Sequence, residues 1–250
     1  MLSPFTDHLV VIDDLGVSWA TGNDLQHLAT RWHSTETGEP LAACAALLDE
    51  VPRAALPYLD RATLVLGYPH VQYLMLPWQE NLYSPADWKG FAAALFSQQL
   101  SLDPEEWQLE IDHAPFNAPR LAVALSKTLL DDLRALFKAK RFHVQRCTPL
   151  LTFALQRYWH EVPPDAVVAV PHGHSLSCGF VHEGRLTQVC ALEVAPEAPL
   201  GDSLIAVDIL AGDRGQHTLV VAAHDGFMQP PTAQPWRWLG PLHPWLGAQP

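Results

Sequence analysis

The segment VVAVPHGHSLSCGFVHEGRLTQV, residues 167–189, places apolar runs on either side of two turn signals. The first turn contains Gly173, and the second is formed by Glu183 and Gly184. Valine-rich runs that are bounded by turn residues are typical of β-strands. The segment therefore predicts a strand, a tight turn and a hairpin. It also carries a cluster of potential ligand residues: His172, His174, Cys178 and His182.

Helical and strand-like segments alternate on both sides of this hairpin. Strands are predicted where apolar residues alternate or run between turn signals, and helices where they recur every three to four residues. The predicted strands lie in 8–21, 62–78, 106–125, 142–147, 203–211 and 217–224. The predicted helices lie in 41–51, from Ser84 onward, from Ser126 onward and in 150–160. This order predicts an α/β protein with mixed sheets.

Composition and charge narrow the class of protein. The 250 residues are 48% hydrophobic, which is enough to build a core and argues against a disordered chain. The net charge of -12 repels phosphate backbones and anionic lipid, so no nucleic-acid partner is expected. No apolar window is long enough to span a membrane, and MLSPFTDHL lacks the features of a signal peptide. Four cysteines without C-x-x-C spacing predict reduced thiols in a cytoplasmic protein.

The histidine cluster permits three interpretations. On a strand, His172 and His174 would face the same side, and Cys178 or His182 would complete a zinc site. Alternatively, the glycine turn holds a phosphate, or the segment is a structural or partner-facing hairpin. No HExxH motif or paired-cysteine motif accompanies the histidines.

The segment 13–16, Asp-Asp-Leu-Gly, is the second candidate site. Such a sequence is an ordinary hairpin turn, and it also suits a turn that approaches phosphate. A paired-carboxylate role is disfavoured, because adjacent residues on a strand face opposite ways. The chain contains no Walker A motif, no strand-placed GxGxxG and no GxSxG.

Three features resemble one family, the PilM-type pilus-assembly proteins and the cytoplasmic domain of the type II secretion L component. They are a strand that ends in Leu76-Pro77-Trp78 before a helix, the strand–helix–strand–helix order of 120–158, and the segment 167–189. The resemblance implies an actin-like (ribonuclease H-like) two-lobed α/β fold with mixed β-sheets flanked by helices. It implies a first lobe over 1–145, a second lobe over 146–228, and a Pro/Trp-rich tail over 229–250.

The resemblance also implies where a nucleotide site would lie. Active members of this superfamily carry an Asp-x-Gly turn in each half, which approaches phosphate and its metal. Asp14 and Gly16 match the first turn, whereas Gly173 and Ser175 match the second. Pro171 stands where the second aspartate is expected. We therefore expect these four residues to be remnants of a nucleotide site, with no catalytic residue and no cofactor, and ATP with Mg²⁺ as the alternative.

The implied function is that of a non-catalytic scaffold in a type IV pilus or type II secretion-like assembly. Its partners would be other components of that assembly, and it would be cytoplasmic, peripheral at the inner membrane through a partner. A homodimer is also compatible with the resemblance. The alternatives are an ATP-binding enzyme of the actin-like superfamily and a metal-dependent hydrolase that uses His172 and His174. The tail, 229–250, contains Trp236, Trp238 and Trp245, and is expected to form no regular strand or helix but a strap or a docking segment.

Overall fold

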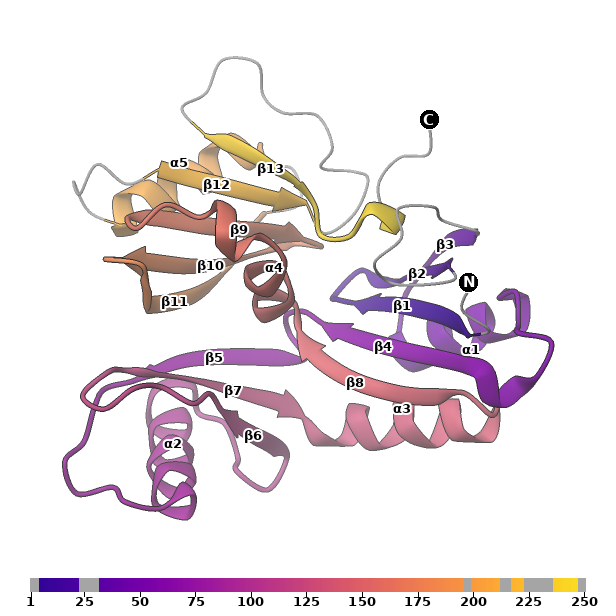
Figure 1. The fold of residues 1–250 in the computed structure, drawn as a ribbon, viewed down its shortest axis with the longest axis horizontal. Helices are drawn as coiled ribbons and strands as arrows, with labels where there is room; N and C mark the ends of the chain where they lie inside the picture. Colours follow the sequence, from indigo (N-terminus) through magenta and orange to yellow (C-terminus); the bar gives the residue numbers. More distant parts are fainter. Residues whose placement is uncertain (1–4, 23–31, 196–198, 212–216, 223–235, 247–250) are drawn as a thin grey trace.

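The computed structural model describes residues 5–22, 32–195, 199–211, 217–222 and 236–246 (Figure 1). Its architecture contains two five-stranded sheets and one three-stranded sheet, with helices packed against them. The α/β class with mixed sheets flanked by helices is therefore confirmed. None of the helices in the described ranges has the length and apolar character needed to cross a membrane.

The two five-stranded sheets share one topology. The first has the order β3-β2-β1-β4-β8, and the second has the order β11-β10-β9-β12-β13. In each, an antiparallel meander is followed by two further strands that pair in parallel. The first sheet comprises β1 (Thr6–Ile12), β2 (Gly16–Gly22), β3 (Trp32–Thr37), β4 (Asp60–Leu66) and β8 (His143–Pro149). The second comprises β9 (Ala166–His172), β10 (Ser175–His182), β11 (Arg185–Glu193), β12 (His217–Ala222) and β13 (Arg237–Pro241). The two halves of the chain are thus structural relatives without a visible sequence repeat.

The third sheet is inserted between β4 and α3 and forms a separate layer. It has the order β5-β7-β6 and is antiparallel throughout. Its strands are β5 (Val71–Leu76), β6 (Trp107–Ile111) and β7 (Arg120–Ser126), and helix α2 (Pro85–Leu100) covers it. The segment 62–78 therefore supplies one strand to each of two sheets, because the turn at Gly67 redirects the chain.

Helix α4 (Leu150–Tyr158) joins the two halves. It leaves β8 and leads to β9, and most of its residues are buried in the core between the two large sheets (Figure 1). The backbone N–H of Leu151 also donates to the hydroxyl of Tyr73, with 3.1 Å between the two atoms. The other helices are α1 (Pro40–Glu50), α3 (Lys127–Ala139) and α5 (Leu200–Ala211). The expected boundary between residues 145 and 146 falls inside β8, a strand of the first sheet.

Two predictions about the C-terminal region are wrong. Residues 203–211 form helix α5 rather than a strand: Leu204 and Val207 are buried three residues apart, while Ile209 is exposed. A short, continuous apolar run contains no period by which a helix and a strand differ.

The tail, predicted to contain no regular strand, forms β13 at the edge of the second sheet. An edge strand tolerates the flanking prolines. Trp245 is fully buried against the main core, so this part of the tail acts as a strap. Residues 229–235 and 247–250 lie outside the described residues.

Candidate functional site

The turn between β1 and β2 is built by an aspartate. Asp13 Oδ1 accepts hydrogen bonds from the backbone N–H groups of Leu15, at 2.9 Å, and Gly16, at 3.3 Å. Gly16 has a φ of 148°, and a Cβ at this position would lie 2.2 Å from the carbonyl oxygen of Glu36. The close approach of β3 therefore requires glycine here, whatever the turn binds.

The turn between β9 and β10 faces the first turn across the gap between the two large sheets. The backbone N–H of His174 donates to both carboxylate oxygens of Asp14, at 3.2 and 3.0 Å. His174 Nδ1 lies 3.2 Å from Asp14 Oδ2. Gly173 has a φ of 51°, and a Cβ there would lie 1.7 Å from Asp14 Oδ1. Asp14 thus reaches across from the first half of the chain and takes the donors of the second.

A third turn, between β4 and β5, closes the base of this arrangement. Gly67 donates its N–H to the carbonyl of Ile12, at 2.8 Å, and a Cβ at Gly67 would lie 2.9 Å from His172 Nδ1. His172 is fully buried, and its Nε2 shares a 2.9 Å hydrogen bond with Ser177 Oγ. Burial lowers the pKa of His70 in this turn, although the carbonyl of Asp13 and the two aspartates act to raise it.

Two carboxylates and one imidazole converge where the turns meet. One ligand atom from each of Asp13, Asp14 and His172 lies within 4.8 Å of the others, and the described residues contain no other such group. Oxygen and imidazole donors of this kind suit a divalent transition metal. Asp13 and Asp14 can converge because β1 ends at Ile12, so they lie in the turn and not on a strand. The argument from strand alternation against a carboxylate pair was therefore wrong.

The zinc interpretation, one of the three that the sequence permits, needs His172 and His174 with Cys178 or His182, and this set is not assembled in the described residues. Cys178 lies opposite Cys190 in the register of β10 and β11, and the Cys190 thiol and burial both raise the pKa of Cys178. His182 lies at the far end of β10, where its Nδ1 is 2.6 Å from Asp165 Oδ1. Cys178 follows Ser177, the partner of His172, and therefore faces the opposite side of β10, while His182 lies at the other end of the strand.

The predicted nucleotide residues are partly brought together. Asp14 and Gly173 are in direct apposition, whereas Gly16 packs against β3. Ser175 begins β10 and is buried, and its hydroxyl has no hydrogen-bond partner among the described residues. Asp13 belongs to the predicted segment 13–16, whereas Gly67 and His70 were missed as members of the site. The Gly-Tyr-Pro-His turn is their one signal, and it identifies a turn but not its neighbours.

The Asp14 carboxylate lies where a phosphate at the second turn would bind. A phosphate at the second turn would need the backbone N–H of His174 and the space beside Gly173. The carboxylate of Asp14 occupies both. A phosphate oxygen would have to displace a negatively charged group that already accepts the same hydrogen bonds.

Comparisons with known proteins identify the fold. No family model matches the chain, and no curated protein matches it. The cytoplasmic domain of EpsL, an inner membrane component of the type II secretion system of Vibrio cholerae, superposes with a TM-score of 0.63 at 13% identity. The match covers 94% of this chain and 89% of the EpsL domain. A PilM–PilN type IV pilus biogenesis complex gives a TM-score of 0.62 at 12% identity, over 98% of this chain and 90% of the other.

A third similar structure is described as having an actin-like ATPase fold. It is a Bacteroides thetaiotaomicron protein of unknown function. It superposes with a TM-score of 0.61 at 10% identity, over 89% of this chain and 83% of the other. The chain therefore has the actin-like fold, as the resemblance of its hairpins and helices predicted.

Proposed function

We propose that the chain is a non-catalytic assembly-platform protein of a type IV pilus or type II secretion-like system. It acts by protein–protein interaction in the cytoplasm, at the inner membrane through a partner. The observation that carries the proposal is the position of the Asp14 carboxylate, which occupies the donors of the second turn in place of a phosphate. Two structurally similar assembly proteins, EpsL and PilM, indicate the kind of apparatus.

A contact that holds the two halves of the chain together without a nucleotide is what a scaffold needs. In an actin-like fold the gap between the halves is where a ligand would bias their relative position, and here a side chain of the chain itself bridges it. The continuous core around α4 adds a second, apolar connection. Both features favour a fixed platform over a protein that opens and closes with ATP.

The proposal is tested by two measurements on the purified full chain. The first is co-purification with a PilN-like protein encoded in the same genome. The second is Mg²⁺-dependent ATP hydrolysis. We expect a stable complex and no turnover above buffer. Turnover that is lost in an Asp14→Ala variant, together with the absence of a complex, would contradict the proposal.

A metal-dependent enzyme is the second candidate, and one observation favours it. The ligand atoms of Asp13, Asp14 and His172 already converge to within 4.8 Å, which is close to the geometry of a metal site. Thermal unfolding with Mn²⁺ or Zn²⁺ tests it, because a bound ion raises the midpoint by mass action. A rise that His172→Ala abolishes supports this candidate, whereas no rise excludes a site of useful affinity.

A further inference from the structure

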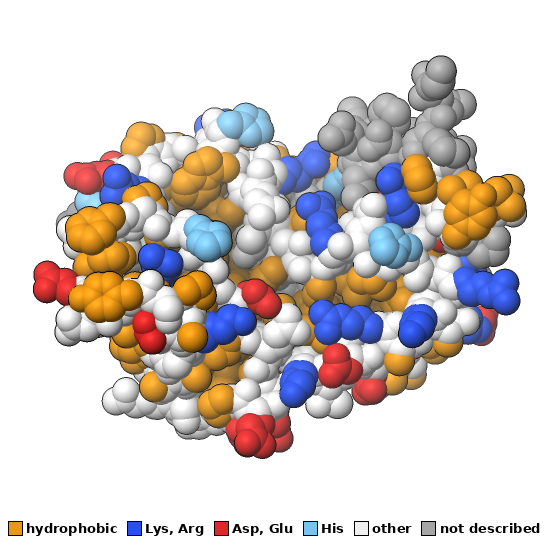
Figure 2. All heavy atoms as spheres, turned by 60° about the horizontal axis from the view of Figure 1, so that its bottom comes forward, with side chains coloured by type: hydrophobic (Ala, Val, Ile, Leu, Met, Phe, Trp, Pro, Cys, Tyr) orange, Lys and Arg blue, Asp and Glu red, His pale blue; other side chains and the backbone are white. Residues whose placement is uncertain are grey.

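A groove of about 620 Å³ lies at the end of the three-stranded sheet remote from α3. Its walls come from the segment after β5, the first turn of α2 and the β6–β7 connection. The residues that matter here are Trp78, Tyr83, Pro85, Trp88, Phe116 and Arg120. Figure 2 shows hydrophobic side chains interspersed with single charged ones at the left of the molecule, where this subdomain lies.

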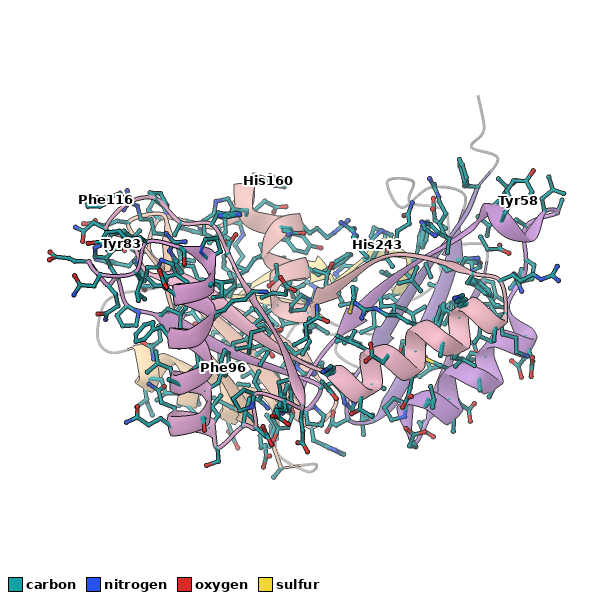
Figure 3. The ribbon with its side chains drawn as sticks, turned by 90° about the horizontal axis from the view of Figure 1, so that it is seen from below. Tyr58, Tyr83, Phe96, Phe116, His160 and His243 are labelled. Atoms are coloured by element: carbon teal, nitrogen blue, oxygen red, sulfur yellow. The ribbon has the colours of Figure 1, made fainter. Side chains whose placement is uncertain are left out.

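Two of the aromatic side chains stand out from the surface. Tyr83 is 86% exposed and Phe116 is 85% exposed, and both line the groove at the same end of the molecule (Figure 3). The ring centroids of Phe116 and Trp78 are 4.7 Å apart, and those of Trp78 and Trp88 are 5.8 Å apart. Exposed apolar patches of this kind mark interaction sites in soluble proteins. The rings of Phe116, Trp78 and Trp88 therefore form a row that runs from the surface to the base of the groove.

Arg120 gives the groove its polarity. Its guanidinium carbon lies 4.3 Å from the centroid of Trp88 and 6.0 Å from that of Trp78. Its Nε is shielded from solvent, and within the described ranges this atom has no hydrogen-bond acceptor. Glu80 and Glu110 line the same groove, but none of the described ion pairs joins them to Arg120. Stacked on the tryptophan rings, with its Nε lacking an acceptor and with no described ion pair, this guanidinium is set to bind a carboxylate.

We propose that this groove binds an extended, proline-containing segment of a partner protein, with a carboxylate of that segment paired to Arg120. Proline-rich segments in the polyproline II conformation dock into aromatic-lined grooves and lose little conformational entropy in doing so. Tyr83 and Phe116 project beyond the groove, where a chain that lies across them would cover both rings. A small ligand enclosed in the groove would leave the two rings exposed.

The groove would give the proposed scaffold a docking site for its partner. The inference rests on the proposed function only for the identity of that partner. The groove is separate from the gap between the two large sheets, since all of its residues belong to the three-stranded sheet, α2 and their connections. Binding at the groove can therefore be measured without reference to nucleotide.

The test is fluorescence anisotropy with a labelled polyproline peptide that carries one central glutamate, and with the same peptide carrying glutamine. We expect saturable binding of the glutamate peptide and binding at least about tenfold weaker for the glutamine peptide. The double variant Tyr83→Ala/Phe116→Ala should weaken binding at least about tenfold, in line with the loss of two aromatic contacts. Arg120→Gln should remove the difference between the two peptides.

Tyr58→Ala is the matched control, because Tyr58 is 70% exposed and lies at the opposite end of the molecule (Figure 3). It should leave the affinity unchanged. The proposal is overturned if neither peptide binds at millimolar concentration, if both bind equally well to the unaltered chain, or if Tyr58→Ala weakens binding as much as the groove variants. It is also overturned if the groove variants dissolve a homodimer in sedimentation, because the occupant would then be a second copy. Failure here with an intact pilus-protein complex removes the groove and leaves the scaffold function in place.

Discussion

The gap between the two large sheets and the aromatic groove treat their hydrogen-bond donors in opposite ways. In the gap, the backbone donor at His174 is taken by Asp14, a residue of the same chain. In the groove, the described structure leaves the Nε donor of Arg120 without an acceptor. A site that is satisfied from within has little to gain from a ligand, whereas an unsatisfied, partly desolvated cation gains from an acceptor. The contrast supports our proposals that a ligand is recognised at the groove and that the gap is closed by the chain itself.

The largest expected effect comes from filling the space between the two turns. Gly173→Ala places a Cβ where Asp14 Oδ1 now lies, at a φ of 51° that disfavours other residues. We expect a loss of about 1–3 kcal/mol in the free energy of unfolding. Chemical denaturation measures it, and the double variant Gly173→Ala/Asp14→Ala should recover part of the loss. A neutral Gly173→Ala would show that the turns are not in contact.

A smaller loss follows from removing the bridging carboxylate alone. Asp14→Ala leaves the exposed N–H of His174 without its acceptor and removes a carboxylate that is only 20% exposed, and should cost about 1 kcal/mol. Asp165→Ala is the matched control, because Asp165 also pairs with a histidine, His182, but its side chain is 49% exposed, whereas that of Asp14 is 20% exposed. That variant should change stability by less than about 0.5 kcal/mol. Equal losses of stability in the two variants would show that the Asp14 contact contributes no more than an ordinary surface pair.

Acid should lower the stability of the fold through the partly buried imidazole of His70, which lies in the turn at the gap. Burial lowers the pKa of His70 below its ordinary 6.5, so the fold favours the neutral ring. Below pH 6.5 the unfolded chain binds more protons than the folded one, and stability therefore falls as pH falls through this range. Denaturation at pH values above and below 6.5 measures the slope.

His70→Asn should flatten this slope, and the flattening should be partial. Burial also lowers the pKa of His8, despite its 3.1 Å hydrogen bond to Asp60, so His8 continues to contribute. A slope that is the same in the variant and in the unaltered chain would show that His70 is not held neutral by the fold.

The groove should give the smallest change in stability. Tyr83→Ala and Phe116→Ala remove rings that are mostly exposed, so each should alter the free energy of unfolding by less than about 0.5 kcal/mol. The thermal midpoints of the two variants should match that of Tyr58→Ala. A large loss of stability would mean that the rings hold the subdomain together rather than face a partner.

The sequence predicted the fold through local signals. The capped helix at Ser84 and the two hairpins at Gly16 and Gly184 were each readable from a few residues, because caps and turns depend on neighbours in the chain. The apolar run 203–211 was misread, since burial of Leu204 and Val207 on one face is decided by the sheet it packs on. The described part of the tail was misread for a related reason, because β13 exists only through pairing with β12.

The site was less predictable, since it depends on contacts between distant segments. Asp14 and His174 are far apart in the chain, and no local pattern indicates that a carboxylate from one hairpin reaches the other. The same holds for Gly67, whose neighbour His172 comes from the second half. Local chemistry identified the residues that could act, while topology decided which of them meet.

Thermal unfolding of the full chain with and without Mg²⁺-ATP tests the central claim most directly, with Mg²⁺ alone as the control. A ligand at a hundred times its dissociation constant would add about 2.7 kcal/mol, which raises the midpoint by an easily measured amount. With Asp14 bound to the second turn, we predict no shift. A rise in the midpoint with Mg²⁺-ATP, and not with Mg²⁺ alone, would contradict the account and show that the chain binds the nucleotide.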